Sequence, residues 1–185
     1  MMSTGRVLVL GLGNDILTDD AVGLVVAREV GCRVGADEAI EARWTTEMGL
    51  ALLDEITGCD VLVLVDAVQT GRKPAGSLHE LVVDDLHVLP SVTPHFLGIG
   101  ETLALGRMLE LPMPGRVRVF GIEVGDMQTL GTQLTAAVAG ALPGIVDTVL
   151  EVARAELRSS SESELAQIAV AHRGSTGALG GGQCR

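Results

Sequence analysis

An apolar segment that runs into a glycine-rich loop and then into a helical pattern limits the folds open to this chain. Residues 7–10 are continuously apolar, which is typical of a strand buried on both faces of a sheet. Residues 11–14 read Gly-Leu-Gly-Asn and indicate a tight loop. From Asp19 onward, apolar residues recur at helical spacing until Gly31. The chain therefore begins as strand, loop and helix.

The rest of the sequence continues this alternation. Further strands are predicted near residues 39–44, 61–65, 77–83 and 116–122, and helices near 48–56, after residue 95 and over 135–157. The pattern predicts the α/β class, a three-layer sandwich with a mainly parallel twisted sheet flanked by helices. Because crossovers in such sheets are right-handed, the loops after the first and third strands are expected at the same carboxyl edge.

Length and composition predict one folded unit. A chain of 185 residues fits one domain, and we expect a single α/β domain over residues 1–158. Hydrophobic residues make up 47% but aromatic residues only 2%, so the core is expected to be aliphatic. Beyond Ser159 the chain is rich in serine and glycine, and we expect residues 159–185 to form a mobile tail.

Charge and hydropathy exclude two classes of binding partner. Lys and Arg number 13 against 24 Asp and Glu, and the formal charge of -11 would repel the phosphate backbone of nucleic acid. The longest apolar runs are too short to cross a bilayer, and the N-terminus lacks a signal-like segment. We therefore expect a cytoplasmic protein with neither a nucleic-acid partner nor a membrane, while the oligomeric state stays open.

Acidic residues follow two of the predicted strands at the expected carboxyl edge. Asp19 and Asp20 open the first helix, where aspartate is favoured as a cap. Two adjacent acids cannot both cap the same amides, so one is expected to cap and the other to face the edge. Asp66 directly follows residues 61–65 and reaches the same edge, although it could also cap a turn. Together they indicate either a metal site or a carboxylate pair that shares a proton.

His95 differs from the other histidines because Pro94 stiffens the backbone before it and a helix follows. With the two carboxylates it would form an O,O,N ligand set that suits nickel or zinc. His79, His87 and His172 occupy strand, loop and tail positions that require only contact with solvent. Two further acids near loop or strand ends are expected to be solvated or capping, namely Glu47 and Glu123.

The glycine loop also invites a nucleotide-binding interpretation, because such loops let backbone amides approach phosphate. The third glycine of that motif would fall at Ile16. Asp19 and Asp20 would also repel the phosphate that a helix N-terminus attracts. A nucleotide-binding module is therefore disfavoured.

Three motifs in order carry a resemblance to a known family. Residues 11–20 read GLGNDILTDD, residues 63–67 read VLVDA and residues 93–95 read TPH. Over nearly all of residues 7–151 the chain resembles the hydrogenase maturation endopeptidases, which trim the C-terminus of the large subunit of nickel-iron hydrogenases. By position, Asp20, Asp66 and His95 correspond to the residues of that family that contact nickel.

The resemblance implies an endopeptidase, of aspartic or metal-assisted type, that acts on a hydrogenase large-subunit precursor after nickel insertion. Nickel would arrive with the precursor and serve as the recognition element, with Asp20 and Asp66 as the catalytic residues. The alternative from another class is a receiver-like signalling domain, which gathers acids around magnesium at the same edge. That alternative requires a lysine at the end of a later strand, whereas the only lysine, Lys73, falls in a loop.

Overall fold

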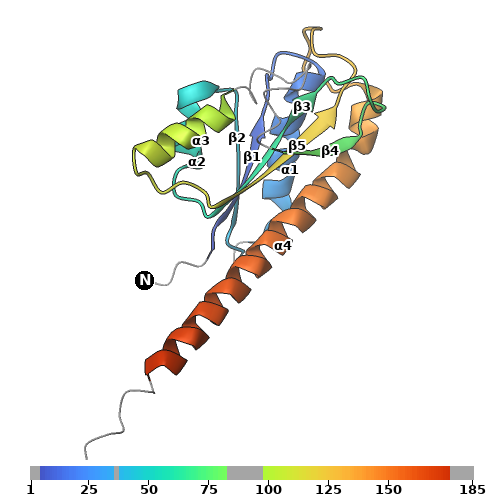
Figure 1. Cartoon of the computed structure of the whole chain (residues 1–185). Helices are drawn as coiled ribbons and strands as arrows, with labels where there is room; N and C mark the ends of the chain where they lie inside the picture. Colours follow the sequence, from blue (N-terminus) through green and yellow to red (C-terminus); the bar gives the residue numbers. More distant parts are fainter. Residues whose placement is uncertain (1–4, 36–37, 83–97, 176–185) are drawn as a thin grey trace, which may run out of the picture.

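A five-stranded sheet forms the centre of the molecule (Figure 1). The computed structural model describes residues 5–35, 38–82 and 98–175, and describes side chains only as far as residue 162. The strands lie in the order β2-β1-β3-β5-β4. Their bounds are β1 Val7–Leu12, β2 Ile40–Thr45, β3 Val61–Val68, β4 Leu78–Leu81 and β5 Arg116–Glu123. Only β4 is antiparallel to its neighbour, so the predicted, mainly parallel sheet is confirmed.

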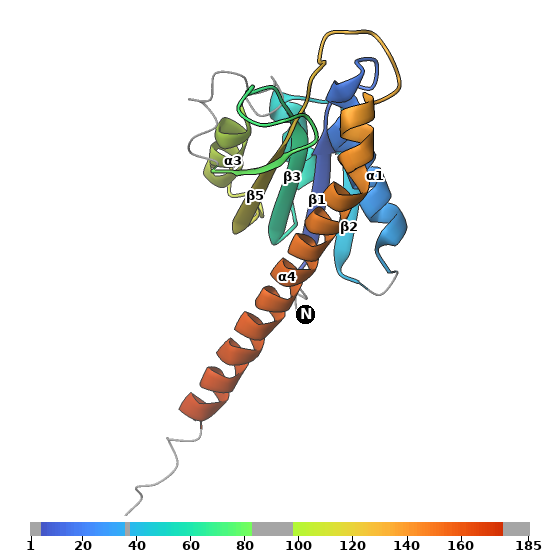
Figure 2. The ribbon, with the colours of Figure 1, turned by 90° about the vertical axis from the view of Figure 1, so that its right-hand side faces the viewer.

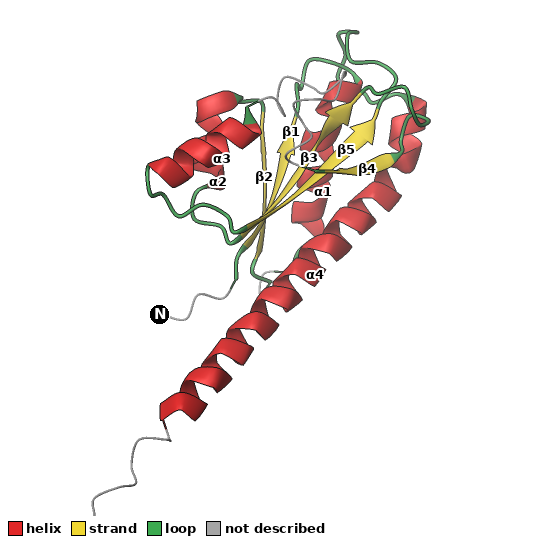
Figure 3. Cartoon of the chain, viewed as in Figure 1, coloured by secondary structure: helices red, strands yellow, loops and turns green. Residues whose placement is uncertain are grey.

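Helices cover both faces of the sheet, as Figures 2 and 3 show. They are η1 Asp19–Ala21, α1 Val22–Arg33, η2 Gly49–Ala51, α2 Leu52–Ile56, α3 Ile99–Met108 and α4 Ala136–Ser175. The helices α1 and α4 pack on one face, and α2 and α3 pack on the other. The predicted three-layer sandwich is therefore confirmed.

Alternation along the strands divides the core into two clusters. In β3, Val61, Val63 and Val65 belong to the cluster beneath α1 and α4. Leu62 and Leu64 belong to the cluster beneath α2 and α3. Successive side chains of a strand point to opposite faces, so a strand that is buried on both sides must be apolar throughout. This requirement explains the continuous apolar runs in the sequence.

Two predicted boundaries were wrong. The third strand does not stop before Asp66, because β3 pairs with β5 as far as Val68 opposite Glu123. Asp66 therefore lies inside a strand rather than in the loop after it. The last helix does not end near residue 157 but continues to Ser175, across the predicted domain boundary at Ser159. The mobility of the tail stays a prediction.

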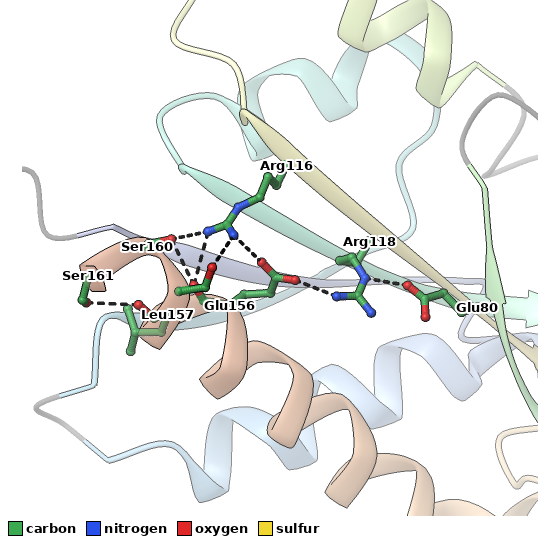
Figure 4. A network of polar contacts seen from close by, with 8 residues as sticks. Glu80, Arg116, Arg118, Glu156, Leu157, Ser160 and Ser161 are labelled. Atoms are coloured by element: carbon green, nitrogen blue, oxygen red, sulfur yellow. Dashed lines mark hydrogen bonds and ion pairs between the residues drawn. The ribbon is translucent and has the colours of Figure 1, made fainter. Parts of the chain in front are cut away.

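A polar network fastens α4 to the sheet (Figure 4). Glu156 of α4 is buried and pairs with Arg118, at 2.6 Å, and with Arg116, at 3.0 Å. Arg118 also pairs with Glu80 of β4, and Arg116 donates to Ser160. By length and composition the stretch Ala136–Glu162 would be able to cross a membrane. The buried apolar residues of this stretch line the core cluster between α4 and the sheet, namely Val138, Ile145, Val146, Val149, Leu150 and Ala153.

Candidate active site

Close packing of the first helix against two strands brings Asp20 towards Asp66. A Cβ atom on Gly23 would lie 2.2 Å from the carbonyl oxygen of Leu12 in β1 and 2.5 Å from that of Val65 in β3. It would also lie 3.1 Å from the Cα atom of Asp66. Only a glycine permits this approach. The preceding turn, η1, thus lies directly against β3 at the carboxyl edge.

The turn between β1 and η1 is equally tight. The backbone N–H of Asn14 donates to the carbonyl oxygen of Asp20 at 3.3 Å. A Cβ atom on Gly13 would lie 2.2 Å from that same oxygen, so the position requires glycine. The glycine loop of the sequence therefore serves to fold η1 back onto the end of β1. This compact turn fixes the backbone that carries Asp20.

Both predicted carboxylates are removed from bulk solvent. Asp20 is 6% exposed and Asp66 is fully buried. The backbone N–H of Ala67 donates to Oδ1 of Asp66 at 2.8 Å. Asp66 lies between Leu64 and Val68 in the alternation of β3, so its side chain belongs to the face covered by α2 and α3. In such surroundings a carboxylate interacts more strongly with a cation than it would in water.

Asp19 has a structural role, but it does not cap its own helix as expected. Its side chain is fully buried and accepts hydrogen bonds from the backbone N–H of Thr135, at 2.7 Å, and from Oγ1 of Thr135, at 2.9 Å. It also accepts from the backbone N–H of Asp126 at 3.3 Å. No side-chain cap is present at η1. Asp19 therefore joins η1 to the segment that leads into α4.

The third predicted ligand, His95, lies outside the described residues, together with Pro94 and His87. Within residues 5–35, 38–82 and the described side chains from 98 onward, no three His, Cys, Asp or Glu side chains form a metal-binding group. The structure thus brings the segments of Asp20 and Asp66 together, and the role of His95 stays a prediction.

A buried acid near this edge was missed from the sequence. Glu123 is 2% exposed rather than solvated, and it accepts hydrogen bonds from Thr70 Oγ1 at 2.5 Å and from the backbone N–H of Gly71 at 2.7 Å. His79 Nε2 lies 3.0 Å from the same carboxylate, so His79 is not merely in contact with solvent. Burial raises the pKa of Glu123, but the hydrogen bonds from Thr70, Gly71 and His79 outweigh burial and lower it.

This cluster fixes the loop that follows the strand of Asp66. Because Thr70 and Gly71 both donate to Glu123, the chain after β3 is held at the end of β5. The sequence did contain a signal for Glu123, since it follows an alternating strand at the same carboxyl edge as Asp66.

Comparison with known proteins assigns the chain to a family. A family model described as HycI, hydrogenase maturation protease, matches residues 47–152, which is more than half of the chain. The chain belongs to the hydrogenase maturation protease family. It is therefore a peptidase. The alternative prediction, a receiver-like signalling domain without enzymatic activity, is wrong.

Two hydrogenase-related proteins match the chain over most of their length. Hydrogenase 2 maturation protease of Escherichia coli (strain K12) is 26% identical over 168 residues, which cover 89% of this chain and 98% of that protein. The hydrogenase expression/formation protein HupD of Rhizobium leguminosarum bv. viciae is 27% identical and covers 80% of this chain, while this chain covers 74% of HupD.

Solved structures agree with these sequence matches. The hydrogenase maturating endopeptidase HybD from E. coli superposes with a TM-score of 0.66 at 26% identity, covering 84% of this chain and 93% of HybD. A [NiFe] hydrogenase maturation protease HybD from Thermococcus kodakarensis is 23% identical and superposes with a TM-score of 0.61. The match covers 80% of this chain and 99% of that protein. The second similarity supports the fold alone.

Proposed function

We propose that this protease removes the C-terminal extension of a nickel-iron hydrogenase large-subunit precursor once nickel has been inserted. One observation carries the proposal: η1 lies against β3, so two buried carboxylates, Asp20 and Asp66, belong to adjoining segments at one edge of the sheet. Family membership supports a hydrogenase protein as the substrate.

In this proposal nickel is part of the substrate and is held by the precursor. Asp20, Asp66 and His95 complete its coordination once docking exposes the two buried carboxylates, since carboxylate oxygens and imidazole nitrogens are suitable ligands for nickel. His95 precedes the start of α3 at Ile99 by four residues, and α3 covers the sheet face that bears the Asp66 side chain. Precursor without nickel would lack this link and would dock poorly, so metal insertion would gate cleavage.

The chemical step is the hydrolysis of one peptide bond. The oxygen of a water molecule attacks the scissile carbonyl carbon, the C–N bond breaks, and the leaving amine gains a proton. A carboxylate of Asp20 or Asp66 that accepts a proton from the water would generate the nucleophile. Nickel that polarises the scissile carbonyl would also favour the reaction, because it makes the carbonyl carbon more electrophilic.

The decisive experiment mixes the protein with a hydrogenase large-subunit precursor prepared with and without nickel. Mass spectrometry should detect a shortened large subunit and a released C-terminal peptide only in the nickel-loaded sample. Equal cleavage of both preparations would contradict gating by nickel, and no cleavage of the loaded precursor would contradict the proposed substrate.

Single substitutions test the three proposed residues. Asp20→Asn, Asp66→Asn and His95→Gln should each abolish processing while the far-ultraviolet circular dichroism spectrum stays unchanged. Asp54→Asn is a matched control because Asp54 is an exposed aspartate in α2. A residue whose variant processes the precursor at the control rate would be removed from the proposed site.

A further inference from the structure

The part of β3 that carries Asp66 is held differently from the rest of the strand. As far as Val65, β3 lies between β1 and β5 and pairs with both. Residues 66–68, which we call the β3 extension, pass the last residue that pairs with β1. Among the described strands, only β5 pairs with them. The position of the β3 extension therefore depends on one neighbouring strand and on the contacts at its far end.

Glu123, the last residue of β5, makes those contacts. It pairs with Val68, the last residue of β3. Its carboxylate accepts hydrogen bonds from Thr70 Oγ1 at 2.5 Å and from the backbone N–H of Gly71 at 2.7 Å, just after β3 ends. In the backbone, the N–H of Val124 donates to the carbonyl oxygen of Val68 at 2.9 Å. The β3 extension is thus fastened to β5 through both side chain and backbone.

The contacts of Glu123 lie on the face of the sheet that bears the Asp66 side chain. Gly121 of β5 pairs with Asp66 on one side and with His79 of β4 on the other, so these three residues form one row across the sheet. Paired residues point to the same face, and so does Glu123, two positions after Gly121. His79 Nε2 lies 3.0 Å from the Glu123 carboxylate. We call Glu123, His79, Thr70 and Gly71 the Glu123 cluster.

Tight packing connects the two ends of the β3 extension. A Cβ atom on Gly121 would lie 2.8 Å from Cγ1 of Val68 and 3.1 Å from Cδ1 of Leu81. The Val68 side chain therefore fills the space above Gly121, the residue that pairs with Asp66. Because this space is full, a shift of Val68 cannot be taken up locally and must also move its neighbours.

The stability of the fold alone does not require an acid at this position. Glu123 is 2% exposed, and burial of a charge is costly unless the charge is paired and hydrogen-bonded. Buried ion pairs can often be replaced by well-packed apolar side chains without loss of stability. A buried carboxylate with several donors beside a candidate active site therefore indicates a functional role.

We propose that Glu123 is a positioning residue for the cleavage reaction: through the Glu123 cluster it fixes the β3 extension, and with it the carboxylate of Asp66. This inference rests on the proposed function, because it requires that Asp66 take part in cleavage. Glu123 acts without touching the precursor or its nickel. The rate of the chemical step then depends on a residue outside the set that contacts the substrate.

The test measures the single-turnover rate with the full-length protein in excess over nickel-loaded precursor, which isolates the cleavage step from binding. Circular dichroism selects a temperature at which every variant is folded. Glu123→Leu removes the acceptor of the Thr70, Gly71 and His79 contacts and should lower the rate about tenfold, since a misplacement of about 1 Å can cost about 100-fold. Glu123→Gln keeps an oxygen for the Gly71 N–H and should retain most of the rate.

Glu156→Leu is the matched control. Glu156 is also a buried glutamate bound to β5, but it pairs with Arg116 and Arg118 towards the opposite end of that strand (Figure 4). Its replacement should lower Tm and leave the single-turnover rate at the wild-type value. The comparison separates a general loss of stability from a loss of position at Asp66.

A second pair of variants keeps the test decisive if Glu123→Leu does not fold. Thr70→Val replaces a hydroxyl by a methyl group and should lower the rate several-fold, whereas Thr70→Ser keeps the hydroxyl and should retain more of the rate. Amide hydrogen exchange needs no substrate: the N–H of Gly71 should exchange faster in Thr70→Val than in the wild type, and no faster in Glu156→Leu.

The outcomes separate this inference from the proposed function. If the wild-type protein leaves the loaded precursor intact, the proposed function fails and this inference fails with it. If the wild type cleaves but the Glu123→Leu and Thr70→Val proteins cleave at its rate, the positioning role is refuted alone. Equal losses of rate in Glu123→Leu and Glu156→Leu would also overturn it, because the effect would then come from stability.

Discussion

Replacing Gly23 by alanine is expected to damage both the fold and the proposed active site. The added Cβ atom would lie 2.2 and 2.5 Å from the carbonyl oxygens of Leu12 and Val65. Both oxygens belong to central strands, so neither can rotate away as a side chain would. The helix must therefore move outward, and η1 must move away from β3.

The size of the effect follows from two opposing contributions. An added methyl group in a well-packed core typically lowers the free energy of unfolding by about 1–3 kcal/mol. Because the contacts here are with backbone atoms that cannot move aside, we expect a loss of about 3 kcal/mol. Alanine has a higher helix propensity than glycine, which offsets up to about 1 kcal/mol. The net loss of about 2 kcal/mol in the free energy of unfolding corresponds to a decrease in Tm of about 4–8 °C for a domain of this size.

Gly140→Ala provides the matched control. Gly140 lies inside α4, and nothing lies within 4 Å of the position that its Cβ atom would occupy. The same substitution should therefore raise the free energy of unfolding by about 0.5–1 kcal/mol. Urea unfolding followed by circular dichroism measures both variants, and the cleavage assay measures their activity.

Activity should separate the two variants further than stability does. A shift of η1 would separate Asp20 from Asp66, so the Gly23 variant should lose most of its cleavage activity even at temperatures where it is fully folded. A Gly23→Ala protein as stable and as active as Gly140→Ala would refute the argument that close packing at this point assembles the site.

Three further substitutions have defined outcomes in urea unfolding experiments. Asp19→Asn should cost about 1–3 kcal/mol, because the part-buried Thr135 amide and hydroxyl lose a charged acceptor. A smaller loss would contradict the proposed link to α4. The lowered pKa of Glu123 means that its contribution is complete above its unfolded pKa of about 4.5 and is lost as pH falls through the lower folded pKa. Stability of the wild type should therefore decline more steeply below pH 4.5 than that of Glu123→Gln, and parallel curves would exclude this role. Glu156→Gln should lower the free energy of unfolding by about 1–2 kcal/mol, because two arginines pair with Glu156. Asp147→Asn is the control: it breaks an exposed ion pair and should lower the free energy of unfolding by less than about 0.5 kcal/mol.

Local patterns in the sequence determined the layers of the fold and the place of two acids. Residues 7–10 and 61–65 are apolar at every position because both faces of β1 and β3 are buried. Since parallel strands share one carboxyl edge, the segments of Asp20 and Asp66 could be brought to that edge without coordinates, although Asp66 lies inside β3 and not after it. These features can be predicted from the sequence because the burial of a strand or helix face leaves a pattern among neighbouring residues.

Only the tertiary structure decided how the acids are partnered. Asp19 bonds to Thr135, which is 116 residues away, and the sequence had suggested a cap within its own helix. Glu123 is buried because Thr70, Gly71 and His79 from separate segments all face it. No local pattern encodes these contacts, since they depend on how distant elements meet.

The same distinction explains the boundaries that were missed. The strand β3 continues past Asp66 because β5 offers a full ladder as far as Val68, and strand pairing is a nonlocal interaction. The helix α4 was predicted too short because serines near Ser159 obscured the alanine, leucine, glutamate and glutamine residues that follow, which favour helix. Local periodicity therefore defined which elements form, and long-range pairing defined where they end and which polar groups they bury.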